Sequence, residues 1–141
     1  MRTKRNRSHE LLNACYFGNK NLALRLLREG ANPNYIDPRD GWTGLHYAAR
    51  WGQLSVVKGL IAAGADLNIL TRERETPLHI ACSKNRVEIC KILMYNGANP
   101  RMLDQSQQRP ADLTADKEIK FICEHFEEYK KIMAEKQKAQ K

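Results

Sequence analysis

The stretch Thr76-Pro77-Leu78-His79 decides the fold of this chain of 141 residues, because a close copy of it, Thr43-Gly44-Leu45-His46, stands 33 residues earlier. A second motif has nearly the same period: Gly30-Ala31-Asn32 returns as Gly64-Ala65-Asp66 and again as Gly97-Ala98-Asn99. Two unrelated motifs that share a period of 33 to 34 residues indicate an internal repeat. The sequence therefore predicts a repeat architecture.

Each repeat should contain two short antiparallel helices. Thr76 can accept a hydrogen bond from a free N–H group at a helix start, and Pro77 suits the first helical position because its missing N–H costs nothing there. Apolar residues spaced three and four apart then run up to a glycine that suits a left-handed helix cap. The residues expected at positive φ are Gly18, Gly52 and Asn85 between the helices, and Gly30, Gly64 and Gly97 after the second helix.

The run Thr76-Pro77-Leu78-His79-Ile80-Ala81, the run Gly64-Ala65-Asp66-Leu67-Asn68 and their spacing resemble those of ankyrin repeats, over roughly residues 8 to 126. The resemblance implies an all-helical solenoid of about four stacked helix-turn-helix repeats, with short β-hairpin fingers projecting at right angles. The fingers are expected at about 31–42, 65–75 and 98–108. The expected organisation is a basic N-terminal arm at 1–7, an ankyrin-repeat domain at 8–129 with repeats at about 8–39, 40–72, 73–105 and 106–129, and a charged C-terminal helical extension or linker at 130–141.

The first and last repeats should be atypical, because each must protect an apolar face that no neighbour covers. Gly44 and Glu10 stand where the family usually has proline, and one extra residue lengthens the first finger around Asp37 to Asp40. The last repeat keeps only Arg109-Pro110-Ala111-Asp112 of the motif. We therefore expect two full internal repeats between two capping repeats.

The net charge of +8 is concentrated at the two ends of the chain. Residues 1–7 carry four basic and no acidic side chains, residues 130–141 carry five basic and one acidic, and residues 8–129 are balanced. A nucleic-acid-binding stack would be expected to carry its charge on a folded face. The charge therefore favours solvated tails, and it leaves a membrane-surface or nucleic-acid tether through these tails as an alternative function.

Motifs for catalysis are missing from the sequence. It has no phosphate-binding glycine loop, no Gly-x-Ser-x-Gly turn and no His-Glu-x-x-His pair, and the resemblance gives His46 and His79 a structural role. We expect no enzyme, no cofactor and no metal site. No apolar run is long enough to span a membrane and no signal peptide opens the chain, so a cytoplasmic or nuclear monomer is expected. The residues expected as buried, reduced thiols are Cys15, Cys82, Cys90 and Cys123.

The resemblance implies a protein-interaction module that binds a partner protein or peptide through its concave face, which finger tips and the ends of the first helices form. Tyrosine, tryptophan and arginine dominate binding hot spots, and they gather over the first two repeats. Tyr47, in contrast, is expected in the core by its helical position. The predicted partner-binding residues are Tyr16, Phe17, Arg39, Trp42, Arg50, Trp51, Arg72 and Arg74.

Two further hypotheses come from the resemblance. Asn34 and Asn68 stand in a context similar to that modified by an asparaginyl hydroxylase acting on ankyrin hairpins, and the competing interpretation is a turn-stabilising asparagine. The length also suits a stand-alone regulator or inhibitor of an enzyme such as a kinase. The leading interpretation is a binding module within a larger scaffold or trafficking protein, as its N-terminal domain.

Overall fold

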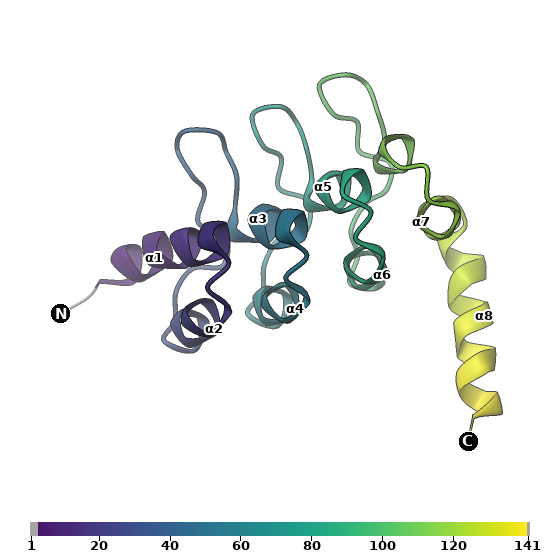
Figure 1. Cartoon of the computed structure of the whole chain (residues 1–141), viewed down its shortest axis with the longest axis horizontal. Helices are drawn as coiled ribbons and strands as arrows, with labels where there is room; N and C mark the ends of the chain where they lie inside the picture. Colours follow the sequence, from purple (N-terminus) through teal and green to yellow (C-terminus); the bar gives the residue numbers. More distant parts are fainter. Residues whose placement is uncertain (1–2, 141) are drawn as a thin grey trace.

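The computed structural model describes residues 3–140, which form a row of stacked helix pairs with long loops projecting to one side (Figure 1). The first helices of the pairs lie in one row and the second helices in another (Figure 1). The elements are α1 (Lys4–Phe17), α2 (Lys20–Arg28), α3 (Gly44–Trp51), α4 (Leu54–Ala62), α5 (Pro77–Ser83), α6 (Val87–Tyr95), the 3₁₀ helix η1 (Pro110–Leu113), α7 (Lys117–Glu124) and α8 (Phe126–Ala139).

The core lies between the two rows of helices and repeats with the sequence. Leu26, Leu60 and Leu93 occupy the same place in α2, α4 and α6, and all three are fully buried. The first helices contribute small residues such as Ala48 and Ala81, which allow neighbouring pairs to approach closely. Each pair therefore buries its apolar face against the next pair, as expected of a solenoid.

The Thr-x-x-His motif builds a capping box and also links adjacent repeats. Thr43 accepts a hydrogen bond from the backbone N–H of His46, and the His46 Nδ1 accepts one from the backbone N–H of Thr43, at 3.1 Å. The His46 Nε2 lies 3.0 Å from the backbone carbonyl of Glu75 in the next repeat, to which it donates. His79 repeats this arrangement towards the carbonyl of Gln108, at 2.9 Å. The structural role expected for both histidines is confirmed.

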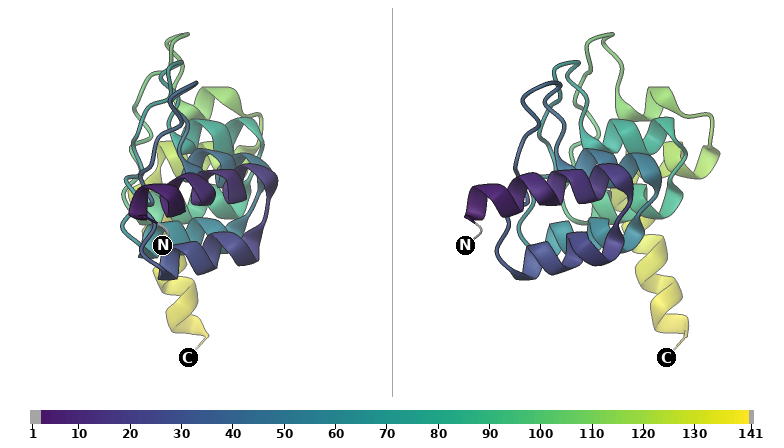
Figure 2. Two further views of the ribbon diagram at one scale, coloured as in Figure 1. Left: turned by 90° about the vertical axis from the view of Figure 1, so that its left-hand side faces the viewer. Right: turned by 60° about the vertical axis from the view of Figure 1, so that its left-hand side comes forward.

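The loops that join the pairs are the expected fingers, and they rise side by side from one side of the stack (Figure 2). The expected β-hairpins are not confirmed: residues 3–140 contain no strand, and one isolated antiparallel bridge joins Ile36 to Thr43. Backbone hydrogen bonds close the turn within each finger, as from the Thr71 N–H to the Glu75 carbonyl at 3.0 Å, and others run between fingers. Arg72 N–H donates to the carbonyl of Asp40, and Gln105 N–H to that of Glu73, both at 3.0 Å.

The turn residues have the backbone conformations that the sequence predicted. Gly18, Gly52 and Asn85 have φ values of 74°, 70° and 55°. The glycines that follow the second helices, Gly30, Gly64 and Gly97, have φ values of 90°, 91° and 103°. The spacing of these residues therefore located the reversals of the chain correctly.

Both ends of the described chain are helical, including the expected C-terminal extension. Residues 4–7 of the expected basic arm form the first turn of α1, and Ser8 fixes this turn by donating to the Lys4 carbonyl and accepting from the Asn32 N–H, at 2.7 and 2.8 Å. The expected boundary at 129 lies inside α8, which is one continuous helix from Phe126 to Ala139. Met1, Arg2 and Lys141 lie outside the described residues.

The capping repeat at the C-terminal end is shorter than an inner repeat. Its first helix is reduced to η1, and Asp116 caps α7 by accepting from the Ile119 N–H at 3.0 Å. Tyr129 buries the first turns of α8 against the stack, as the expected apolar stripe requires. None of the helices in residues 3–140 combines the length and the apolar character that crossing a membrane requires.

All four cysteines are buried free thiols, as the sequence predicted. Burial raises the pKa of the Cys15 thiol to about 12, so this side chain stays protonated at neutral pH.

The Sγ of Cys15 also explains why Gly44 replaces the usual proline. A Cβ atom at position 44 would lie 3.0 Å from that sulfur, which is closer than ordinary van der Waals contact.

We predict that Gly44→Ala destabilises the protein by about 1–2 kcal/mol, because overpacking a tight contact costs this much. In a Cys15→Ala background the same change should be neutral or stabilising, since the obstructing sulfur is gone and alanine favours the helix. Urea unfolding of the four proteins forms a double-mutant cycle that measures the coupling. Additive effects of the two substitutions would contradict this explanation of Gly44.

A second prediction concerns His46, whose pKa burial lowers from 6.5 to about 4. Because the unfolded chain binds the proton more readily, the stability gained from the neutral ring is fully present above about pH 6.5 and is lost as the pH falls towards 4. Between about pH 7 and pH 4 the wild type should therefore lose roughly 2–3 kcal/mol more than His46→Asn. Urea unfolding across this pH range measures the difference, and parallel pH profiles would refute it.

Candidate protein-binding surface

Aromatic side chains form a continuous series of ring contacts across the first two repeats, where α1 and α3 meet the first finger. The rings of Phe17 and Tyr16 lie 4.8 Å apart between centroids, edge to face. Tyr16 meets Tyr47 in the same manner at 5.2 Å, and Tyr47 stacks on Trp42 at 4.9 Å. Residues from two helices and a finger thus come together at one surface.

Arg50 extends this series at the C-terminal end of α3. Its guanidinium carbon lies 5.9 Å from the centroid of the Trp42 ring and 5.1 Å from that of Trp51, so the cation is held between two indoles. We refer to Phe17, Tyr16, Tyr47, Trp42, Arg50 and Trp51 together as the aromatic strip.

The aromatic strip is attached to the core through one buried ring, and three of its other rings are exposed to water. Tyr47 is 5% exposed and belongs to the core, as the sequence predicted. Phe17, Trp51 and Tyr16 are instead 78%, 49% and 46% exposed. These three side chains leave large apolar areas in contact with water, while the buried ring of Tyr47 fixes the position of Tyr16 and Trp42.

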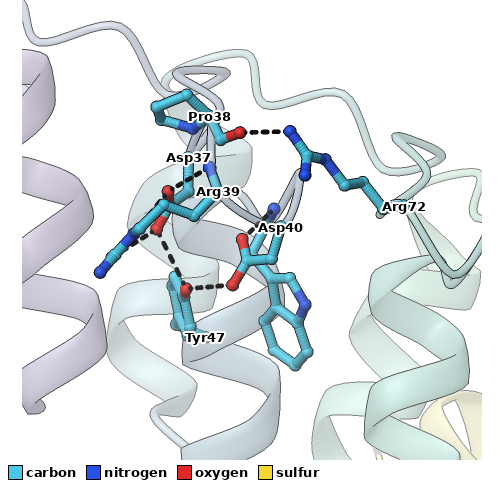
Figure 3. A network of polar contacts seen from close by, with 7 residues as sticks. Asp37, Pro38, Arg39, Asp40, Tyr47 and Arg72 are labelled. Carbon is cyan, nitrogen blue, oxygen red and sulfur yellow. Dashed lines mark hydrogen bonds and ion pairs between the residues drawn. The ribbon is translucent and has the colours of Figure 1, made fainter.

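Hydrogen bonds hold the first finger against the strip (Figure 3). The Tyr47 hydroxyl donates to Asp40 Oδ2 at 3.2 Å, and Asp40 Oδ1 accepts from the Trp42 N–H at 2.9 Å. Burial raises the pKa of Tyr47, and the Asp40 charge raises it further, so the hydroxyl remains a donor. At the other end of the strip, the Arg86 guanidinium donates to the carbonyl of Arg50 at 3.0 Å and so fixes the end of α3.

Two of the predicted binding residues are engaged in contacts within and between the first two fingers (Figure 3). Arg39 forms an ion pair with the buried Asp37 at 2.7 Å, and this contact holds the pKa of Asp37 below its usual range. Arg72 reaches from the second finger to the first, where it donates to the Pro38 carbonyl at 2.6 Å. Both arginines therefore stabilise finger geometry, and their binding role stays a prediction.

Arg74 lies exposed in the turn of the second finger. It has a φ of 62°, an unusual value for a residue other than glycine, and its N–H donates to the Thr71 carbonyl at 2.9 Å. The ring series does not reach it. The structure thus brings together Tyr16, Phe17, Trp42, Arg50 and Trp51 and leaves Arg39, Arg72 and Arg74 in the fingers.

Sequence reasoning did not anticipate two features of this surface. Tyr47 was expected in the core alone, yet its ring connects the two halves of the strip. The carboxylates of Glu73, Glu75 and Asp104 line one pocket between the second and third fingers. One feature of the sequence could have indicated that Glu75 lies near this surface. Glu75 directly precedes Thr76, as Trp42 directly precedes Thr43, so the two residues occupy equivalent positions in their repeats.

Asn34 and Asn68 connect neighbouring fingers through their side chains. Asn34 Oδ1 accepts from the Asp66 N–H at 2.7 Å, and Asn68 Oδ1 accepts from the Asn99 N–H at 2.9 Å. These contacts give both residues a structural role between repeats. Their hydroxylation stays a prediction, to be checked by intact-mass measurement after treatment with such a hydroxylase.

The remaining charges do not form a second site of this kind. The basic residues of α1 and of α8 lie at opposite ends of the stack, so they do not join into one surface (Figure 1). Within residues 3–140, no group of three or more histidine, cysteine or acidic side chains is arranged to hold a metal ion. The aromatic strip is therefore the candidate site that the geometry supports best.

Comparison with known proteins gives similarity to parts of longer chains. ARF GTPase-activating protein Git of Drosophila melanogaster is 44% identical over 52 residues, which are 37% of this chain and 7% of that protein. Human ARF GTPase-activating protein GIT1 is 39% identical over 64 residues, 45% of this chain and 8% of that protein. The ankyrin repeat protein FPV223 of fowlpox virus is 45% identical over 49 residues, 35% of this chain and 34% of that protein.

This chain therefore matches only a small part of the ARF GTPase-activating proteins and about one third of the viral protein. The family model described as ankyrin repeats in three copies matches residues 11–104. This range covers more than half of the chain and runs from the middle of α1 to the third finger. By its repeats, its capping boxes and this match, the chain belongs to the ankyrin-repeat family.

Proposed function

We propose that this protein binds a partner protein through its concave face, with the aromatic strip at the centre of the contact. Ankyrin repeats are protein-interaction modules, and the proposal assigns that role to one surface of this chain. The observation that carries it is the exposure of Phe17, Trp51 and Tyr16 next to the Arg50 cation, across two adjacent repeats. Aromatic and arginine side chains of this kind dominate the energy of protein interfaces.

The rigidity of the strip supports the proposal. Tyr16 contacts the buried Tyr47 and Trp51 contacts the Arg50 guanidinium, so these two exposed rings have less side-chain freedom to lose when a partner binds. The second-helix side of the stack has no comparable series of ring contacts over α2 and α4 in the described chain.

The similar proteins support a role as one module of a larger protein. Git and GIT1 are named for ARF GTPase activation, and the similarity covers 7% and 8% of their lengths. We propose that this repeat domain positions a scaffold or trafficking protein by holding a partner. A stand-alone regulator of an enzyme would use the same surface, and identification of the bound partner separates the two.

The two tryptophans should differ in their effect on stability. Trp42 is half-buried against the core and stacks on Tyr47, so Trp42→Ala should lower the free energy of unfolding by about 2–4 kcal/mol. Trp51 is half exposed, and Trp51→Ala should cost less than about 1 kcal/mol. Urea unfolding measures both values. A similar decrease in the free energy of unfolding for both variants would show that Trp51 also packs as part of the core.

Because Trp51→Ala keeps the fold, it can test binding. Proteins captured from cell extract by the wild type should be reduced about tenfold or more on Trp51→Ala and on Arg50→Ala, as expected when a hot-spot residue is removed. Matched controls are Tyr95→Ala, which removes an equally exposed aromatic (49%) from α6, and Arg28→Ala, which removes a cation from α2. Quantitative mass spectrometry of the captured proteins gives the ratios. Equal capture by wild type, Trp51→Ala and Arg50→Ala would refute the proposed site.

A further inference from the structure

Beside the aromatic strip, the turns of the second and third fingers, the end of α5 and η1 surround an open pocket of about 260 Å³. Its lining includes the carboxylates of Glu73, Glu75 and Asp104, together with Ser83, Gln108 and Leu113. Three acidic side chains thus line one pocket. The pocket and the strip are neighbours, because the Glu75 carbonyl is bound by His46, whose ring centroid lies 5.6 Å from that of Trp42.

Within the described part of the chain, these carboxylates form no ion pair of the kind seen in the first finger, although the Arg50 charge lowers the pKa of Glu75 and so partly offsets the other contributions. In that finger, Asp37 forms an ion pair with Arg39 at 2.7 Å. Asp104 occupies the position equivalent to Asp37 in the third finger, and Ser106 occupies that of Arg39. The Asp104 Oδ1 accepts hydrogen bonds only from the backbone N–H groups of Ser106 and Gln108, both at 2.9 Å. Among residues 3–140, no lysine, arginine or histidine forms an ion pair with any of the three carboxylates of the pocket.

The proximity of these acids is unfavourable in the unbound protein. Burial raises the pKa of the Glu75 carboxyl above its usual range, and the charges of Glu73 and Asp104 raise it further. Asp104 is 7% exposed, so water screens its charge poorly. A cation entering the pocket would relieve the repulsion, whereas a phosphate or a carboxylate would be repelled.

We propose that the partner contributes a peptide segment that places a lysine or arginine side chain between Glu73, Glu75 and Asp104, and an apolar side chain of the same segment against Trp51. This inference rests on the proposed function and adds the chemistry of the partner to it. Charge complementarity argues for this occupant, because the pocket offers three carboxylates that form no ion pair among the described residues, and the strip offers exposed apolar rings. A peptide is long enough to contact both, which a single metal ion is not.

The test uses a random-peptide library displayed on phage and selected on the full chain. The enriched peptides should carry a basic residue close to an apolar or aromatic one. A synthetic copy of the most enriched peptide should bind Glu73→Gln/Glu75→Gln about tenfold or more weakly than the wild type. Replacing its basic residue by glutamine should cause a similar loss on the wild type and little further loss on the double variant, as coupled partners do.

The matched control is Glu127→Gln/Glu128→Gln, which removes the same charge from α8 and should leave peptide binding unchanged. Circular dichroism and urea unfolding verify that both double variants fold. Enriched peptides without a basic residue, no enriched peptide at all, or equal binding by Glu73→Gln/Glu75→Gln would each overturn the inference.

The variant Trp51→Ala separates this inference from the proposed function. If Trp51→Ala loses the peptide while Glu73→Gln/Glu75→Gln retains it, the strip binds and the acidic pocket does not take part, so the inference alone fails. If Trp51→Ala binds the peptide as tightly as the wild type does, the aromatic strip is not the binding centre and the proposed function fails with it.

Discussion

The hydrogen bond from a capping histidine to the backbone of the next finger is the interaction on which the rest of the structure depends. His46 completes the cap of α3 and, through its other ring nitrogen, holds the Glu75 carbonyl of the following repeat. His79 does the same for Gln108. The rings are fully buried, so these bonds are shielded from water and leaving them unmade would be costly. One side chain thus sets a helix start and the distance to the next repeat.

The geometry of the candidate binding surface depends on these hydrogen bonds between repeats. Trp42 directly precedes the cap residue Thr43, and Glu75 directly precedes the cap residue Thr76. Each capping box therefore fixes the backbone next to the residue whose side chain contributes to the surface. Glu75 also supplies the carbonyl that His46 holds, and its carboxylate lines the acidic pocket. The aromatic strip and the pocket therefore contain equivalent positions that are one repeat apart.

Much of the fold could be read from particular residues, and the exceptions have physical reasons. The period, the caps and the positive φ of Gly52 and Asn85 follow from local chemistry that neighbours in sequence complete. The fingers form hydrogen-bonded turns without strands, and further backbone hydrogen bonds join adjacent fingers, which are contacts that sequence patterns do not display. The basic arm became helical because Ser8 ties α1 to Asn32, a contact across 24 residues.

The sequence alone determined a stack of ankyrin repeats with aromatic and basic residues over the first two, since motif and period repeat every 33 to 34 residues. Only the tertiary structure decided which of those residues meet. It joined Tyr16, Trp42 and Arg50 through the buried ring of Tyr47, turned Arg39 and Arg72 to support the fingers, and gathered three carboxylates beside the strip. Contacts of this kind depend on how one repeat is placed against the next, and that placement is not encoded in the residues of either repeat by itself.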